Sequence, residues 1–191
     1  MLGARKGIAF RAVRPFVVVL VIAIGLPVAV TLMSSVANAQ EARTARLMQA
    51  FKDKTARLGA PRIQGEEEVG GKFVPVLYFG STKVNNDFTI VDEVSKEDPG
   101  TVATLFVKVV VQQRIGTAGE EFVRVATSVL LPDGRRGVGT TMGSPALESI
   151  KAGQPYRGEV EVIGARYITD YEPIKDASGE IIGAYFVGYK Q

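Results

Sequence analysis

The stretch "YITDYEPIKDASGEIIGAYFVGY", residues 167–189, decides how the fold is organised. Two runs of alternating residues, 166–174 and 181–189, flank "DASG" at 176–179, a cluster of turn-forming residues. This pattern predicts an antiparallel β-hairpin. A hairpin cannot bury its apolar face alone, so the rest of the chain must supply more strands and a layer that covers them.

The preceding sequence supplies both. Further strands are expected at 73–79, 88–94, 102–111, 122–131 and 158–163, separated by "NND", "DPG" and "PDG". Residues 41–58 have helical apolar spacing and predict an amphipathic helix that ends at Gly59 and Pro61. A short helix is expected at 144–153, with Ser144 as its N-cap and Gly153 as its end. The fold class is therefore α+β, an antiparallel sheet with a long helix on one face.

The other face of this sheet is expected to be only partly covered. The glycine-rich loop and short helix at 134–153 are too small to cover it fully, which leaves a concavity suited to a ligand. The run "EEE" at 66–68 is interpreted as a solvated turn.

The first 39 residues have the layout of a secretory signal peptide. Arg5, Lys6, Arg11 and Arg14 precede an apolar run at 16–33, and "ANA" at 37–39 predicts cleavage after Ala39. The run is also long enough to act as an uncleaved membrane anchor. In both cases residues 40–191 lie outside the cytoplasm, because the positive residues stay inside. We therefore expect a leader or anchor at 1–39, a helix at 40–60 and a sheet-forming domain at 61–191.

Composition excludes several classes of function. The chain has no Cys, His or Trp, so thiol nucleophiles, His-based acid–base pairs and the usual zinc, haem and iron–sulfur ligand sets are missing. No serine has a nucleophile-elbow context, and "GRRGVGTTMG" lacks the ending of a phosphate-binding loop. The basic balance belongs to the leader, which argues against nucleic-acid binding. We expect no enzyme activity, no cofactor and no metal.

Four segments resemble a known family. They are "DFTIVDEV" at 87–94, "TVATLFVK" at 101–108, "EEFVRVATSVLLPDGRRGVGTTMG" at 120–143 and the continuous stretch from "SPALESIKAG" to "YFVGY" at 144–189. Together they are similar to the extracytoplasmic Cache sensor domains of bacterial chemoreceptors and sensor kinases, of the Cache 3/Cache 2 fusion type. The similarity covers roughly residues 45–189.

The resemblance implies a PAS-like antiparallel sheet behind a long N-terminal helix. It also implies a small-molecule pocket on the sheet face opposite that helix, and relatives bind organic acids or amino acids. Receptors of this type continue into a membrane helix and a signalling module, whereas this sequence stops at Gln191. The expectation is a stand-alone sensor that acts with a membrane receptor or sensor kinase and could form a homodimer.

Arg124 and Thr127 are candidate ligand residues on the strand predicted at 122–131. Strict alternation places Arg124 with Phe122 on one face and Thr127 with Val125 on the other, and either face could be the pocket wall. A buried arginine needs a partner. That partner could be a ligand carboxylate, held by a bidentate pair, or a nearby acid such as Glu120 or Glu121.

The opening hairpin and the loop before it supply further candidates. Tyr167, Thr169 and Tyr171 alternate onto one face, and Tyr156 enters the same region from "GQPY". Their hydroxyl groups would suit a small polar ligand, although a tyrosine-rich face packed under the helix is an equal alternative.

Two functions follow. The first is an exported sensor that binds a small organic acid or similar metabolite. The second is a membrane-tethered structural component of a receptor complex with no ligand of its own.

Overall fold

An antiparallel sheet of five strands forms the centre of the domain. A computed structural model describes residues 26–112 and 118–191 of the chain. The strand order is β5-β4-β8-β7-β6. The strands are β4 (Thr101–Gln112), β5 (Ala118–Thr127), β6 (Tyr156–Val162), β7 (Ala165–Lys175) and β8 (Ile181–Lys190). The hairpin predicted from residues 167–189 is β7–β8, paired from Tyr167↔Lys190 to Lys175↔Ile181, and is confirmed.

The remaining elements are helices and a smaller sheet. The helices are α1 (Leu26–Leu58), α2 (Thr89–Glu97) and α3 (Ala146–Lys151). The smaller sheet has the order β1-β2-β3, formed by β1 (Pro61–Val69), β2 (Lys72–Phe79) and β3 (Thr82–Lys83). This arrangement confirms the expected α+β class with a long N-terminal helix and an antiparallel sheet.

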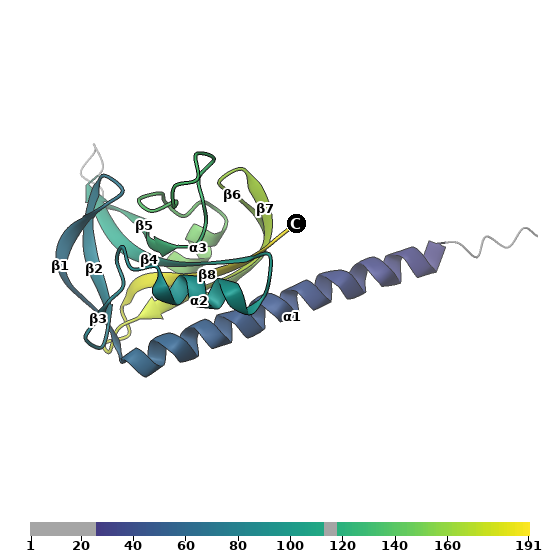
Figure 1. Ribbon diagram of the computed structural model, residues 1–191, viewed down its shortest axis with the longest axis horizontal. Coiled ribbons are helices and arrows are strands. Elements are labelled where there is room, and N and C mark those ends of the chain that lie inside the picture. Colours follow the sequence, from purple (N-terminus) through teal and green to yellow (C-terminus); the bar gives the residue numbers. More distant parts are fainter. Residues whose placement is uncertain (1–25, 113–117) are drawn as a thin grey trace, which may run out of the picture.

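Helices α1 and α2 cover one face of the central sheet (Figure 1). Leu47, Met48 and Phe51 of α1 are buried there, with the ring of Phe51 5.2 Å from that of Tyr185. Each fully buried side chain of this size contributes about 1.5–3 kcal/mol. The hydroxyl groups of Thr55 and Tyr185 lie 2.8 Å apart, which satisfies a polar pair inside this layer.

The opposite face carries α3 and the segment between β5 and α3 (Figure 1). We call this segment, residues 128–145, the cavity loop. Its apolar contacts with the sheet centre on Phe106, Phe122 and Phe186, all nearly inaccessible to solvent. The two faces of the sheet therefore have separate cores, one under the long helix and one under the cavity loop.

Helix α1 ends where the sequence predicts. The helix expected at 41–58 forms its C-terminal part and stops at Leu58. Gly59 follows with φ +124°, and a Cβ there would lie 2.7 Å from the Cα of Gly80. Only glycine fits such a close approach at this backbone conformation. The predicted cleavage point after Ala39 lies within the continuous helix α1.

The described part of the chain contains no helix long and apolar enough to cross a membrane. Most of the apolar run predicted at 16–33, namely residues 16–25, lies outside the described residues, as do the basic residues before it.

The strand expected at 88–94 is wrong, because these residues start helix α2. Val91 and Val94, three residues apart, are both buried on one helical face. The carboxylate of Asp87 accepts the amide of Thr89 at 2.9 Å and so pairs a free amide at the start of the helix. In "FTIVDEV" the apolar spacing fits both the two-residue period of a strand and the 3.6-residue period of a helix. The turn-forming residues "NND" just before it favour the helix.

Two smaller expectations also fail. Residues 66–68 are not a turn but part of β1 and pair with β2. Glu66 and Glu68 are exposed, whereas Glu67 is half-buried and pairs with Lys83 at 2.8 Å. Charged side chains suit an edge strand that must not pair with another molecule. Ser144 is not the N-cap of α3, since the helix begins at Ala146 and its N-cap is Pro145, without a side-chain bond.

Candidate ligand-binding site

A β-bulge sets which side chains of β5 face the cavity loop. Arg124 pairs with Phe106, whereas Ala126 pairs with Leu105, so Val125 is an extra residue between them. Opposed residues of an antiparallel pair share a face, which puts Arg124 beside Phe106 and turns Ala126 toward the helices. The bulge also brings Thr127 onto the face of Arg124, although strict alternation separates the two.

Arg124 is buried without a carboxylate. Its side chain is 4% exposed, and no acid lies within ion-pair distance among the described residues. Nη1 donates to Thr140 Oγ1 at 2.7 Å and to the Thr141 carbonyl at 3.4 Å. The guanidinium lies 4.9 Å from the centre of the Phe106 ring. Nε is buried and has no hydrogen-bond partner within the described chain.

The acids considered as alternative partners are occupied elsewhere. Glu120 pairs with Lys108 at 3.8 Å, and Glu121 pairs with Lys72 at 3.7 Å. Burial lowers the pKa of the Arg124 guanidinium, while the nearby Tyr171 and Tyr167 oppose this effect. An arginine stays protonated in proteins, so this side chain is a buried cation with no paired carboxylate among residues 26–112 and 118–191.

A cavity of about 280 Å³ opens beside Arg124. The cavity loop contributes Thr140, Thr141 and Ser144, strand β6 contributes Val160, Glu161 and Val162, and β7 contributes Tyr171. The lining thus joins apolar side chains to several hydroxyl groups, one buried cation and the exposed carboxylate of Glu161, which suits a small polar molecule.

Tyr171 forms the wall opposite the cavity loop. Its ring lies 4.7 Å from that of Phe186 and 6.2 Å from that of Tyr156. Burial raises the pKa of Tyr171 to about 12 and also raises the pKa of Tyr167. Both phenols are therefore neutral near pH 7 and can donate a hydrogen bond.

The tyrosine-bearing face of β7 lies opposite α1. Tyr171 pairs with Phe186 and Tyr156, and Tyr167 pairs with Val160, all on the side of the cavity loop. This excludes the alternative in which these tyrosines pack under the long helix. Tyr156 lies beside Tyr171 and Tyr167 lies beside Val160, and neither of these two tyrosines lines the cavity itself.

Two threonines predicted as ligand residues have internal partners. The hydroxyl group of Thr127 is fully buried, lies 2.6 Å from that of Thr104 and accepts the amide of Val129. Thr169 donates to the carbonyl of Gly158 at 2.7 Å. Neither lines the cavity. Their ligand-binding roles remain predictions.

Sequence reasoning missed Thr140 and Thr141, which fix Arg124. The doublet "TT" after "GVG" was the available signal. Its meaning depends on the antiparallel bridge between Val123 and Thr141, and this pairing cannot be read from the sequence.

The helix-facing side of β7 carries acids instead of a cavity. Asp170 is fully buried and accepts from Arg157 at 2.9 Å, while its Oδ1 has no partner in the described chain. Glu172 pairs with Lys52 of α1 at 2.6 Å. No group of acids in residues 26–112 and 118–191 could hold a metal ion.

An antiparallel sheet with a long helix on one face and a small pocket on the other is the architecture of a PAS-like sensor domain. The family model for the Cache 3/Cache 2 fusion domain matches residues 28–191, and the chain belongs to this family. Cache domains of this kind are extracytoplasmic sensors that bind small molecules, typically without enzyme activity, in receptors or sensor kinases. No curated protein and no solved structure matches the chain.

Proposed function

We propose that this Cache domain binds a small monocarboxylate in the cavity beside Arg124. The observation that carries the proposal is the buried guanidinium whose Nε has no partner among the described residues. A charge in this position is costly unless an anion pairs with it. A carboxylate is the planar anion that a guanidinium binds through two parallel hydrogen bonds.

The cavity favours one negative charge on the ligand. Arg124 is the only cationic side chain among the described residues that line it. A second carboxylate would face Tyr171 and the β6 side chains, among them the carboxylate of Glu161, with no further cation to compensate. The hydroxyl groups of Thr140, Ser144 and Tyr171 suit instead a carbonyl or hydroxyl group on the same small acid.

Thermal unfolding tests this proposal. Acetate, lactate and pyruvate serve as monocarboxylates and succinate as a dicarboxylate. A ligand at a hundred times its Kd stabilises the folded state by about 2.7 kcal/mol, which raises Tm by about 5–10 °C for a domain of this size. We expect at least one monocarboxylate to do this and succinate to act more weakly.

Two variants locate the effect. Arg124→Lys keeps the charge but loses the paired donors, so it should abolish most of the shift. Arg135→Lys, in the exposed part of the cavity loop, should leave the shift intact. An equal shift in Arg124→Lys and wild type would remove Arg124 from the site, and no shift with any acid would overturn the proposal.

We also propose that a separate membrane protein, a receptor or a sensor kinase, reads the state of this domain at α1. Two observations support this surface. Helix α1 extends beyond the sheet (Figure 1), and Gln191, at the end of β8, lies 3.4 Å from Gln40 of α1. Movement of the sheet can therefore reach the exposed part of the helix.

Crosslinking tests the partner. The chain has no cysteine, so Ala42→Cys, exposed on α1, gives one labelling position. A crosslinker there should capture a membrane receptor or kinase from membranes of the source cells. Capture of a second copy of the chain would show a homodimer instead. The absence of any crosslinked product would contradict both the membrane partner and the homodimer.

A further inference from the structure

Residues 139–142 of the cavity loop lie along β5, held by an isolated antiparallel bridge between Val123 and Thr141 and by backbone hydrogen bonds. The Arg124 amide donates to the Thr140 carbonyl at 2.8 Å, and the Gly139 amide donates to the Arg124 carbonyl at 2.9 Å. The Met142 amide donates to the Phe122 carbonyl at 2.9 Å. The positions of Thr140 and Thr141, and hence of the guanidinium that they hold, therefore depend on how this loop lies on β5.

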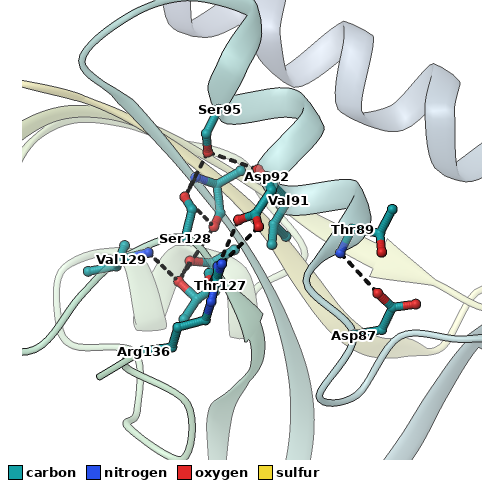
Figure 2. A network of polar contacts seen from close by, with 11 residues as sticks. Asp87, Thr89, Val91, Asp92, Ser95, Thr127, Ser128, Val129 and Arg136 are labelled. Atoms are coloured by element: carbon teal, nitrogen blue, oxygen red, sulfur yellow. Dashed lines mark hydrogen bonds and ion pairs between the residues drawn. The ribbon is translucent and has the colours of Figure 1, made fainter. Parts of the chain in front are cut away.

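Arg136 anchors the part of the cavity loop that precedes Thr140 and Thr141. Its guanidinium donates to both carboxylate oxygens of Asp92, at 2.7 and 2.8 Å, and to the Thr127 carbonyl at 2.7 Å. It also lies 4.3 Å from the centre of the Phe88 ring. Figure 2 shows Arg136 reaching from the loop to the end of β5 and to the carboxylate on α2. The bidentate geometry fixes its orientation as well as its position.

Asp92 belongs to a helix that also contacts α1. Lys54 of α1 pairs with Glu93 and Glu97 of α2 at 3.4 and 3.3 Å. Ser95 of α2 hydrogen-bonds Ser128, the first residue of the cavity loop, at 2.7 Å (Figure 2). Through α2, the wall of the cavity on one face of the sheet is therefore connected to the helical layer on the other.

The neighbouring arginine makes no such connection. Arg135 is 78% exposed and pairs with Asp133, two residues away in the same turn. Arg135 and Arg136 lie in the same loop and each carries a positive charge, but only Arg136 contacts another element. This makes Arg135 a matched control.

We propose that Arg136 is a positioning residue for the cavity. Its pair with Asp92 holds the cavity loop in register on β5 and links occupancy of the cavity to the packing of α2 against α1. This inference rests on the proposed function of the cavity. Because such coupling between sites is reciprocal, a ligand that holds the loop in place strengthens the attachment of α2. Loosening of α2 in turn lowers the affinity of the cavity for the ligand.

Amide hydrogen exchange of the ligand-free full chain tests the positioning role. In Asp92→Asn, the amides of Gly139, Met142 and Arg124 should exchange about tenfold faster, because a charge-assisted pair no longer holds the loop. Exchange in β7 and β8 should stay unchanged, and Arg135→Gln should behave as wild type. Asp92→Glu, which keeps a bidentate carboxylate, should restore slow exchange.

Two results would overturn the proposal. One is unchanged exchange of the three loop and β5 amides in Asp92→Asn and in Arg136→Gln. The other is an equal rise throughout β7 and β8, which would mean that the pair supports only global stability.

Acetate and lactate provide the second arm of the experiment. If wild type binds either acid, Asp92→Asn should bind it about tenfold more weakly, and the acid should slow exchange in α2 of wild type. Equal affinity in wild type and Asp92→Asn would remove the link between α2 and the cavity. If no acid binds wild type, the proposed function fails, whereas the ligand-free exchange still decides the role of Arg136.

Discussion

Arg124 combines two properties that oppose each other. Its guanidinium is positioned by Thr140 and Thr141, yet within the described chain its Nε has no partner and no acid lies at ion-pair distance. A buried charge of this kind lowers stability unless a ligand completes it. Binding sites often keep such costly groups because function requires them.

Removal of this charge should therefore stabilise the empty protein. Arg124→Met keeps the length of the side chain and its contact with Phe106 but needs no anion. Thr140 keeps a partner, since its hydroxyl group donates to Gly137. We expect the free energy of unfolding to rise by about 1 kcal/mol, measured by urea denaturation. A fall of similar size would show that the guanidinium is already satisfied.

Asp170 gives stability a pH dependence of known sign. Burial raises the pKa of its carboxyl group, against the opposing effect of Arg157. In the unfolded chain this group ionises near pH 4. Asp170 therefore contributes to the free energy of unfolding at low pH, where its carboxyl group is protonated in both the folded and the unfolded chain. This contribution is lost as pH rises from the unfolded pKa through the raised folded pKa.

Asp170→Asn should remove this loss. The stability of wild type relative to the variant should fall as pH rises above about 4 and should level off once the folded group is ionised. Urea denaturation from pH 3 to pH 8 measures the difference. A constant difference over this range would show that Asp170 has an ordinary pKa.

The cavity loop depends on glycines that allow close contact with the β1–β2 turn. Gly139 has φ +79°, and a Cβ there would lie 2.7 Å from the carbonyl oxygen of Gly70. Gly134 has a similar φ of +83°, but a Cβ there would meet nothing within 4 Å. The two positions separate backbone strain from crowding.

Gly134→Ala should cost about 1 kcal/mol from the left-handed conformation alone. Gly139→Ala adds a clash between backbone atoms that cannot move aside, so we expect a loss of about 3 kcal/mol or more. Thermal denaturation of both variants provides the comparison. Equal losses would mean that the turn and the loop separate easily.

The sequence predicts helices and strands best where the spacing of apolar residues fits only one of the two periods, that of a helix or that of a strand. The hairpin β7–β8 and the helical residues 41–58 have a single pattern, and both predictions are confirmed. In "FTIVDEV" two periods fit, and burial of Val91 and Val94 by the sheet decides for a helix. Strand β1 is hidden because its three glutamates resemble a turn until β2 pairs with them.

The candidate site shows the same limit. Arg124 and Tyr171 are predicted because an arginine and alternating tyrosines stand out in apolar strands, and both line the cavity. Thr140 and Thr141 are missed because a loop reveals no pairing partner in sequence. The bulge at Val125, which decides the face of Thr127, leaves no signature in "RVATS".

In the described part of the chain, α1 covers one face of the central sheet and extends beyond it toward the N-terminus (Figure 1). The leader predicted at 1–39 would be removed after Ala39, within the helix. Mass spectrometry of the exported protein should then find Gln40 as the first residue. An intact N-terminus would show instead that residues 16–33 tether the domain to the membrane.

An NMR titration decides whether Arg124 holds the ligand. The Nε–H group of Arg124 has no acceptor within the described residues, so its proton resonance should lie at an ordinary position in the free protein. Addition of a stabilising monocarboxylate should move this resonance downfield, with the Kd that thermal shifts give, because a charge-assisted hydrogen bond forms. A ligand that binds while this resonance stays in place would contradict the assignment of the site.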